Sequence, residues 1–302
     1  MKLSSYTEYL LKILYYLSLG FAVYYLYRNN FLDNLLQIEN YVLLGVSVVV
    51  LFAAQMTEAA CMQKAIWMQQ KKHELTYQQT MVVFGKTIFA KYIPGKIFLV
   101  LSLVFYLNKF RISKTNGMAA MLNFQIISLW SGLIFGLSFI LAGSGFSSWL
   151  KVNALIFLLV FAAVFLLRPL QRILDKMAVK ILRREVSVFH YPIKKISSLI
   201  ALFLLTWLLN GVGFYLLTVA KTGITAGWQI ILIFPLARTI GTLAIVTPGG
   251  LGVREGVIAT LLALCGMTLP VGVAVSVLAR IWFFFGELFS YLAGIYFEKR
   301  RN

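Results

Sequence analysis

Charged residues are scarce in this 302-residue chain, and acidic residues are fewer than basic ones. Only 13% of the residues are Asp, Glu, Lys or Arg and 60% are hydrophobic, whereas about a quarter of a typical soluble domain is charged. The charges cluster, which leaves apolar runs such as 41–60, 118–142 and 197–220. These runs are near or above the roughly 20 residues needed to cross a bilayer. The composition excludes an ordinary soluble domain and predicts an all-α integral membrane protein, a single membrane-embedded domain over residues 1–302.

Residues that bind metals or carry catalysis are also few. The chain has two cysteines, Cys61 and Cys265, and two histidines, His73 and His190, in no spaced motif. It has no Cys-x-x-Cys, no His-Glu-x-x-His, no Gly-x-Ser-x-Gly and no evident carboxylate pair for acid–base chemistry. We therefore expect no metal, no cofactor and no catalytic centre, and hence a protein that is not an enzyme.

The apolar segments predict a polytopic helical bundle. No small-residue cleavage site follows the first of them, which we interpret as a membrane helix rather than a signal peptide. Two further apolar regions, 80–107 and 227–266, are each interrupted by a Pro-Gly and are either re-entrant hairpins or pairs of crossings. About six full spans are expected, at 9–27, 40–60, 118–142, 152–168, 197–220 and 270–297.

Basic residues outnumber acidic ones by 28 to 10, which gives a net charge of +18. A nucleic-acid partner is not expected, because these residues lie in short loops between apolar runs. Eighteen fall in loops and tails on the side of the N-terminus, and three (Arg28, Lys151 and Lys221) fall on the other side. The positive-inside rule then places both termini in the cytoplasm of a multi-pass protein of the cell (inner or plasma) membrane. The loop 168–196 is either an amphipathic segment on anionic lipid heads or an orientation signal only.

A short pattern recurs in the two halves of the chain. Lys86-Thr87-Ile88 precedes Pro94-Gly95, and Arg238-Thr239-Ile240 precedes Pro248-Gly249. Each half reads as span, span, broken segment, span, and the predicted topology starts the halves on opposite sides. This order predicts an inverted repeat with halves of about 1–145 and 146–302, an architecture common in secondary transporters.

The Pro-Gly breaks predict irregular backbone at mid-membrane, which is tolerated only where protein or a wet cavity lines it. We expect a helix to restart at Pro248 with Thr247 as its N-cap, and another at Pro94. Two helix N-termini that point inward from opposite sides would form an anion site. Gly249, Gly250 and Gly252 would let a ligand approach the backbone closely. The alternative interpretation is a structural kink.

Ionisable side chains inside apolar segments are costly and are candidates for function. Glu287 lies seven residues after Arg280 on the last span. In the alternative account, Glu255 pairs with Arg280 or Arg238, while Lys12, Lys96 and Glu58 reach the interface. A surplus of at least three cations remains in our count, which an anionic ligand such as a lipid phosphate would balance. Six cations, Lys86, Lys91, Lys96, Arg238, Arg254 and Arg280, face three carboxylates, Glu58, Glu255 and Glu287.

Two motifs resemble those of the lysylphosphatidylglycerol synthase transmembrane family, which includes the flippase domain of the multiple peptide resistance factor. They are Thr247-Pro-Gly-Gly-Leu-Gly-Val-Arg-Glu-Gly256 and Lys91-Tyr-Ile-Pro-Gly-Lys96. The likeness extends over essentially the whole chain. It implies a flippase-like fold that moves anionic or derivatised lipids between leaflets. The chain ends at Asn302, directly after the last span, so we do not expect the aminoacyl-transferase domain of the resistance factor.

The leading hypothesis is therefore a translocase for an anionic phospholipid or a lipid-linked substrate. Aminoacylated phosphatidylglycerol and a polyprenyl-phosphate-linked sugar are the candidate cargoes. The alternatives are a lipid-binding accessory protein of a cell-envelope glycosyltransferase and a small-anion transporter. A homo-oligomer and a cell-envelope enzyme partner both stay open. The expected substrate-binding residues are Lys91, Pro94, Gly95, Lys96, Arg238, Pro248, Gly249, Gly250, Gly252, Arg254, Glu255 and Arg280.

Overall fold

The described part of the chain is built from helices, with no strand. The computed structural model describes residues 37–69, 75–92, 97–143, 146–166, 172, 176, 193–225, 227–244 and 247–300. The expected span 9–27 and most of the loop 168–196 lie outside these residues.

Long apolar helices form the frame of the molecule. Within the described residues, four helices are long and apolar enough to cross a membrane. They are α3 (Tyr41–Gln69), α6 (Lys114–Ala142), α9 (Ile193–Thr222) and α12 (Leu269–Lys299). Each coincides with an expected span, so the prediction of a multi-pass helical membrane protein is confirmed. A further helix, α7 (Ser148–Leu166), occupies most of the expected span 152–168 and packs against α6.

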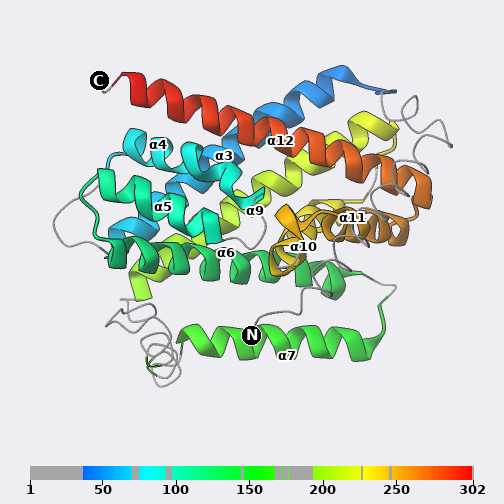
Figure 1. The fold of residues 1–302 in the computed structure, drawn as a ribbon. Coiled ribbons are helices and arrows are strands. Elements are labelled where there is room, and N and C mark those ends of the chain that lie inside the picture. The colour runs from blue at the N-terminus through cyan, green and yellow to red at the C-terminus, as the bar shows by residue number, and fades with distance from the viewer. Residues whose placement is uncertain are drawn as a thin grey trace, which may run out of the picture.

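The helices α3 and α9 pack against each other in antiparallel directions. The backbone N–H groups of Glu39 and Asn40, at the start of α3, donate to the carbonyl oxygen of Ala220 near the end of α9, at 2.9 and 3.0 Å. In Figure 1, α12 runs along one side of this pair and α6 along the other, while α7 lies outside α6. Large apolar side chains such as Val49, Phe105 and Phe285 are exposed on the outer surface, as expected for contact with lipid.

Both Pro-Gly regions are broken into short helices. The first consists of α4 (Tyr77–Thr87), the 3-10 turn η1 (Ile88–Tyr92) and α5 (Ile97–Lys109). The second consists of α10 (Ile230–Leu243), the 3-10 turn η2 (Pro248–Gly250) and α11 (Val253–Leu264). At 1.5 Å per residue, the longest of these helices measures about 21 Å, which is short of the ~30 Å hydrocarbon core. None of them is long enough to cross the membrane alone.

The two broken segments start at opposite ends of the bundle and meet near its middle. Helix α4 follows the C-terminal end of α3 and α10 follows that of α9, and these ends are opposite because the pair is antiparallel. The turns η1 and η2 are in contact (Figure 1). Pro94 and Gly95 lie outside the described residues.

Each broken segment packs closely on a long helix of the other half. Helix α4 lies against α12, where a Cβ atom on Gly85 would be 3.2 Å from the Cα of Gly294. Helix α10 lies against α6, where a Cβ atom on Gly136 would be 2.9 Å from the Cα of Leu236. Small residues at these crossings bring the backbones together, which is how membrane helices gain packing energy.

Candidate functional site

A cavity of about 140 Å³ lies where the two broken segments meet. Thr87 and Ile88 line it from the first segment, and Gly249 lines it from the second. The long helices α3, α6, α9 and α12 complete its walls. The cavity is largely apolar, yet four charged side chains line it: Glu58, Arg238, Arg254 and Glu287.

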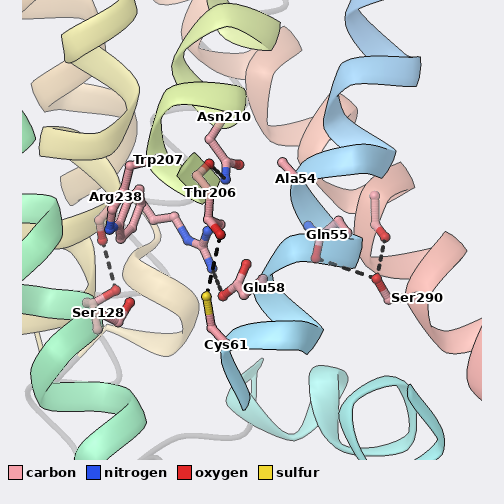
Figure 2. A network of polar contacts seen from close by, with 12 residues as sticks. Ala54, Gln55, Glu58, Cys61, Ser128, Thr206, Trp207, Asn210, Arg238 and Ser290 are labelled. Atoms are coloured by element: carbon pink, nitrogen blue, oxygen red, sulfur yellow. Dashed lines mark hydrogen bonds and ion pairs between the residues drawn. The ribbon is translucent and has the colours of Figure 1, made fainter. Parts of the chain in front are cut away.

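Glu58 of α3 and Arg238 of α10 form an ion pair at 2.5 Å (Figure 2). Arg238 also lies over the rings of Trp207, at 5.1 Å, and Phe283, at 4.8 Å. Glu58 is only 6% exposed, so the interpretation that it reaches the interface is wrong. A carboxylate at this depth is stable because an arginine from another helix meets it inside the bundle.

Uncharged polar groups connect the long helices around this ion pair (Figure 2). The indole Nε1 of Trp207 donates to Ser131 Oγ at 2.9 Å, which joins α9 to α6. Thr206 Oγ1 donates to Thr57 Oγ1 at 3.0 Å and lies 3.6 Å from Cys61 Sγ, which joins α9 to α3. Such bonds stabilise a membrane bundle by roughly 0.6 kcal/mol each, so they fix the positions of the helices more than they add stability.

Arg254, near the start of α11, reaches into the cavity from the second break. Its side chain is only 6% exposed. The guanidinium lies over the rings of Phe234, at 4.4 Å, and Phe283, at 4.7 Å. Its Nη2 atom has no hydrogen-bond partner among the described residues. A buried donor of this kind is costly unless a ligand or water satisfies it.

Arg280 and Glu255 form a second ion pair beside η2. Arg280 Nη1 lies 3.2 Å from Glu255 Oε1 and donates to the carbonyl oxygen of Gly249, also at 3.2 Å. The other carboxylate oxygen of Glu255 accepts from the backbone N–H of Gly252 at 2.7 Å. This agrees with the alternative that paired Glu255 with Arg280. Glu255 therefore binds Arg280 and the backbone at the start of α11. None of the hydrogen bonds seen for Glu255 joins it to Arg254.

The expected helix start at Pro248 is wrong, because α11 begins at Val253. Pro248 belongs to a single 3-10 turn, and Thr247 Oγ1 donates to Ala244 O at 3.3 Å instead of capping a helix. Gly249, Gly250 and Gly252 have φ angles of 59°, 72° and 80°, which no α-helix accommodates. The Glu255 carboxylate already faces the N-terminus of α11, so that end is less open to an outside anion than expected.

The three glycines of the second break do not share one role. Gly249 lines the cavity. Gly250 is buried against α10, where a Cβ atom would be 2.9 Å from the Cα of Gly241. Gly252 is exposed and has no neighbouring atom within 4 Å of such a Cβ. Close approach of a ligand to the backbone is therefore available at Gly249, whereas Gly250 serves packing.

The expected surplus of cations is not found among the described side chains near the cavity. Lys86 pairs with Glu298 at 2.7 Å, near the end of α12, and Glu298 was not in the count. Three arginines, Arg238, Arg254 and Arg280, then balance three carboxylates, Glu58, Glu255 and Glu287. Lys91 belongs to η1, and the structure does not describe its side chain; Lys96 lies outside the described residues.

Several cavity residues were not among the expected site residues. Gln55 of α3 and Gln125 and Ser128 of α6 line the cavity, together with the aromatic rings of Trp207 and Phe283. Gln55 is buried, and its Nε2 atom has no hydrogen-bond partner among the described residues. A search limited to ionisable residues misses these positions. The presence of an amide inside an apolar span was the available signal, because it too is costly in hydrocarbon.

This fold and cavity define a class of protein: a multi-pass helical membrane protein with an arginine-containing cavity between two broken helical segments. Residues 10–288 match the family model described as "Lysylphosphatidylglycerol synthase TM region", and the chain belongs to that family. The predicted family is thereby confirmed. No curated protein matches the chain. Family membership connects the protein to a membrane-lipid function.

Proposed function

We propose that the protein is a lipid translocase that moves an anionic or phosphate-bearing lipid between the leaflets of the cell membrane without a chemical step of its own. The observation that carries this proposal is Arg254, which is buried in the cavity and has a guanidinium nitrogen without a partner among the described residues. Family membership supports a lipid as the cargo.

In this proposal the headgroup phosphate binds beside Arg254. A guanidinium presents donors in a planar fork that fits two phosphate oxygens, and Phe234 and Phe283 hold its plane in place. Gln55, Gln125 and Ser128 would contact the rest of the headgroup, while the hydrocarbon tails stay in lipid. An aminoacylated phosphatidylglycerol and a polyprenyl-phosphate-linked sugar both fit these requirements.

We also propose that the bundle is an inverted repeat. The order α3, α4–η1–α5, α6 would correspond to α9, α10–η2–α11, α12. Two features support this: α3 and α9 are antiparallel, and each broken segment packs on the last helix of the opposite half. Movement of one half against the other about the cavity would then alternate access to the two leaflets.

The test is transport in liposomes that contain the purified protein and a fluorescent lipid in one leaflet. Labelled phosphatidylglycerol, lysyl-phosphatidylglycerol and a polyprenyl phosphate sugar would be compared. We expect the protein to speed the movement of at least one of them, and Arg254→Ala to slow it about tenfold or more, the loss expected from one charge-assisted contact of ~1.4 kcal/mol or more. Arg300→Ala, at the exposed end of α12, is the matched control and should behave like wild type.

Two results would contradict the proposal, and two others would favour a different function. Unchanged lipid movement with every lipid would do so, as would an Arg254→Ala variant as active as wild type. Tight lipid binding without movement, together with co-purification of a glycosyltransferase, would instead favour an accessory protein. Uptake of a small soluble anion with no lipid movement would favour an anion transporter.

A further inference from the structure

Two buried nitrogen donors at the cavity have no hydrogen-bond partner in the described part of the chain. One is Nη2 of Arg254, which the proposed function assigns to the headgroup phosphate. The other is Nε2 of Gln55 on α3, whose side chain also lines the cavity and is only 1% exposed. A buried donor without a partner is costly in an apolar span. Gln55 therefore needs an explanation of its own.

The side-chain amide of Gln55 lies against one turn of α12. The Ser290 hydroxyl lies 3.5 Å from Gln55 Oε1 (Figure 2) and 3.0 Å from the carbonyl oxygen of Gly286, to both of which it donates. A Cβ atom on Gly286 would be 3.1 Å from Gln55 Nε2, so the missing side chain leaves room for the amide. The amide thus has a defined place between α3 and α12, at the wall of the cavity.

Packing alone does not explain an amide at this position. Methionine has nearly the same length as glutamine, fills irregular space well and brings no buried donor. The Ser290 hydroxyl would keep its bond to Gly286 if Gln55 were replaced. We therefore expect Gln55→Met to unfold at the same temperature as wild type or at a higher one, which indicates that the amide serves binding.

The chemistry of the amide restricts the group that can bind it. An amide has N–H donors and a carbonyl acceptor, and a hydroxyl group can satisfy either of them because it both donates and accepts. An ammonium group offers no acceptor to the N–H donors, and an alkyl group offers neither. Glu58 and Glu287 line the same cavity and would repel a second anionic group. The group that fits is an uncharged hydroxyl.

We infer that Gln55 determines headgroup specificity by binding a hydroxyl group of the lipid whose phosphate lies beside Arg254. The preferred cargo is then a phosphodiester lipid with a hydroxyl-bearing headgroup, which is either glycerol or a sugar. The inference rests on the proposed function. It adds to that function a residue that recognises the uncharged part of the headgroup.

The test compares two short-chain lipids that differ only in the hydroxyl groups of the headgroup. Phosphatidylglycerol and phosphatidylpropanol have the same three-carbon headgroup and the same single charge, and only the first carries hydroxyls. Calorimetric titration of the detergent-purified protein would measure both affinities. In Gln55→Met the affinity for phosphatidylglycerol should fall about two- to tenfold, the range for one hydrogen bond between uncharged groups. The affinity for phosphatidylpropanol should not fall, and thermal unfolding of the same sample should show no loss of stability.

Gln63→Met is the matched control, because it makes the same change on the same helix. Gln63 Nε2 donates to the carbonyl oxygen of Leu75 at 2.8 Å, and Gln63 is not among the residues that line the cavity. This variant should leave the ratio of the two affinities as in wild type. A short-chain prenyl phosphate sugar in the same titration distinguishes the two hydroxyl sources, because the preferred cargo is the lipid whose affinity falls more in Gln55→Met.

The outcomes separate the inference from the function on which it rests. Equal losses for phosphatidylglycerol and phosphatidylpropanol in Gln55→Met would mean a structural role for the amide and would overturn the inference. Hydroxyl-bearing lipids that bind Gln55→Met as tightly as wild type would also overturn it, and would leave the proposed function standing. A wild-type protein that binds none of the three lipids would contradict the inference and the proposed lipid site together.

Discussion

The buried charges of Glu58 and Arg238 stabilise each other. Glu58 and Arg238 are 180 residues apart in the sequence and lie on different helices. The bundle encloses most of the pair. Removing one member of a buried pair leaves the other as an uncompensated charge, which costs about 3–5 kcal/mol, whereas replacing both costs far less. The stability of the bundle therefore depends on the presence of both charges or of neither.

We predict that Arg238→Gln and Glu58→Gln each lower the thermal unfolding midpoint strongly in detergent. The double variant should recover most of the loss, which a double-mutant cycle would measure as a coupling energy above about 1.5 kcal/mol. Lys86→Gln and Glu298→Gln give the comparison, because that pair is partly exposed and should cost less than about 1 kcal/mol. Additive losses for Glu58 and Arg238 would show that they are not energetically coupled.

Sequence reasoning identified the ionisable residues of the cavity but not their partners. Arg238, Arg254 and Glu287 were found because charge inside an apolar span is rare. The pairing of Lys86 with Glu298, and of Glu58 with Arg238, depends on which helices pack together. No local spacing encodes that choice, so the sequence alone could not show that Lys86 has a partner in Glu298.

Short helices joined by irregular turns are what distinguish the two broken segments from the other helices of the bundle. The Pro-Gly pairs predicted where the helices stop, because proline removes a donor and glycine tolerates unusual backbone angles. The restart of the second helix was misplaced by five residues, at Pro248 instead of Val253. The left-handed angles of Gly249, Gly250 and Gly252 set that restart, and a glycine in a sequence does not reveal the sign of its φ angle.

We predict that Gly250→Ala destabilises the protein more than Gly266→Ala. Both glycines have left-handed φ angles, 72° and 90°, so both variants carry a cost of about 1–2 kcal/mol for an L-residue in that region. At Gly250 the added Cβ would also lie 2.8 Å from the carbonyl oxygen of Gly241, whereas at Gly266 nothing lies within 4 Å. Crowding against backbone should add a further ~1–3 kcal/mol.

The measurement is thermal unfolding of the two purified variants in the same detergent, with lipid movement in liposomes as the second readout. Gly250→Ala should also reduce transport, because the contact between α10 and η2 positions Gly249, which lines the cavity and accepts a hydrogen bond from Arg280. Equal losses in the two variants would mean that the angle alone matters and that α10 yields to the added methyl group.

Several described basic residues at helix ends lie at one end of the whole bundle. The end of α5, the start of α6 and the end of α12 lie at the same end of the bundle (Figure 1), and they carry Lys109, Lys114 and Lys299. The α3–α9 pair brings the start of α9 to this same end, because its helices are antiparallel. The helix directions therefore agree with the topology used in the charge count, and the count predicts that this end faces the cytoplasm.

We predict that cysteines placed at the two ends of α9 react from opposite sides of the membrane. Ile224, just beyond the C-terminal end of α9, is 57% exposed, and Lys195, at the N-terminal end, is also exposed. In a Cys265→Ser background, a membrane-impermeant maleimide should label Ile224→Cys in intact cells and Lys195→Cys only after permeabilisation. The remaining Cys61 is fully buried and should contribute little signal. Labelling in the reverse order would show that the bundle has the opposite orientation in the membrane. The first broken segment would then open outside the cell, because α4 starts at the Lys195 end.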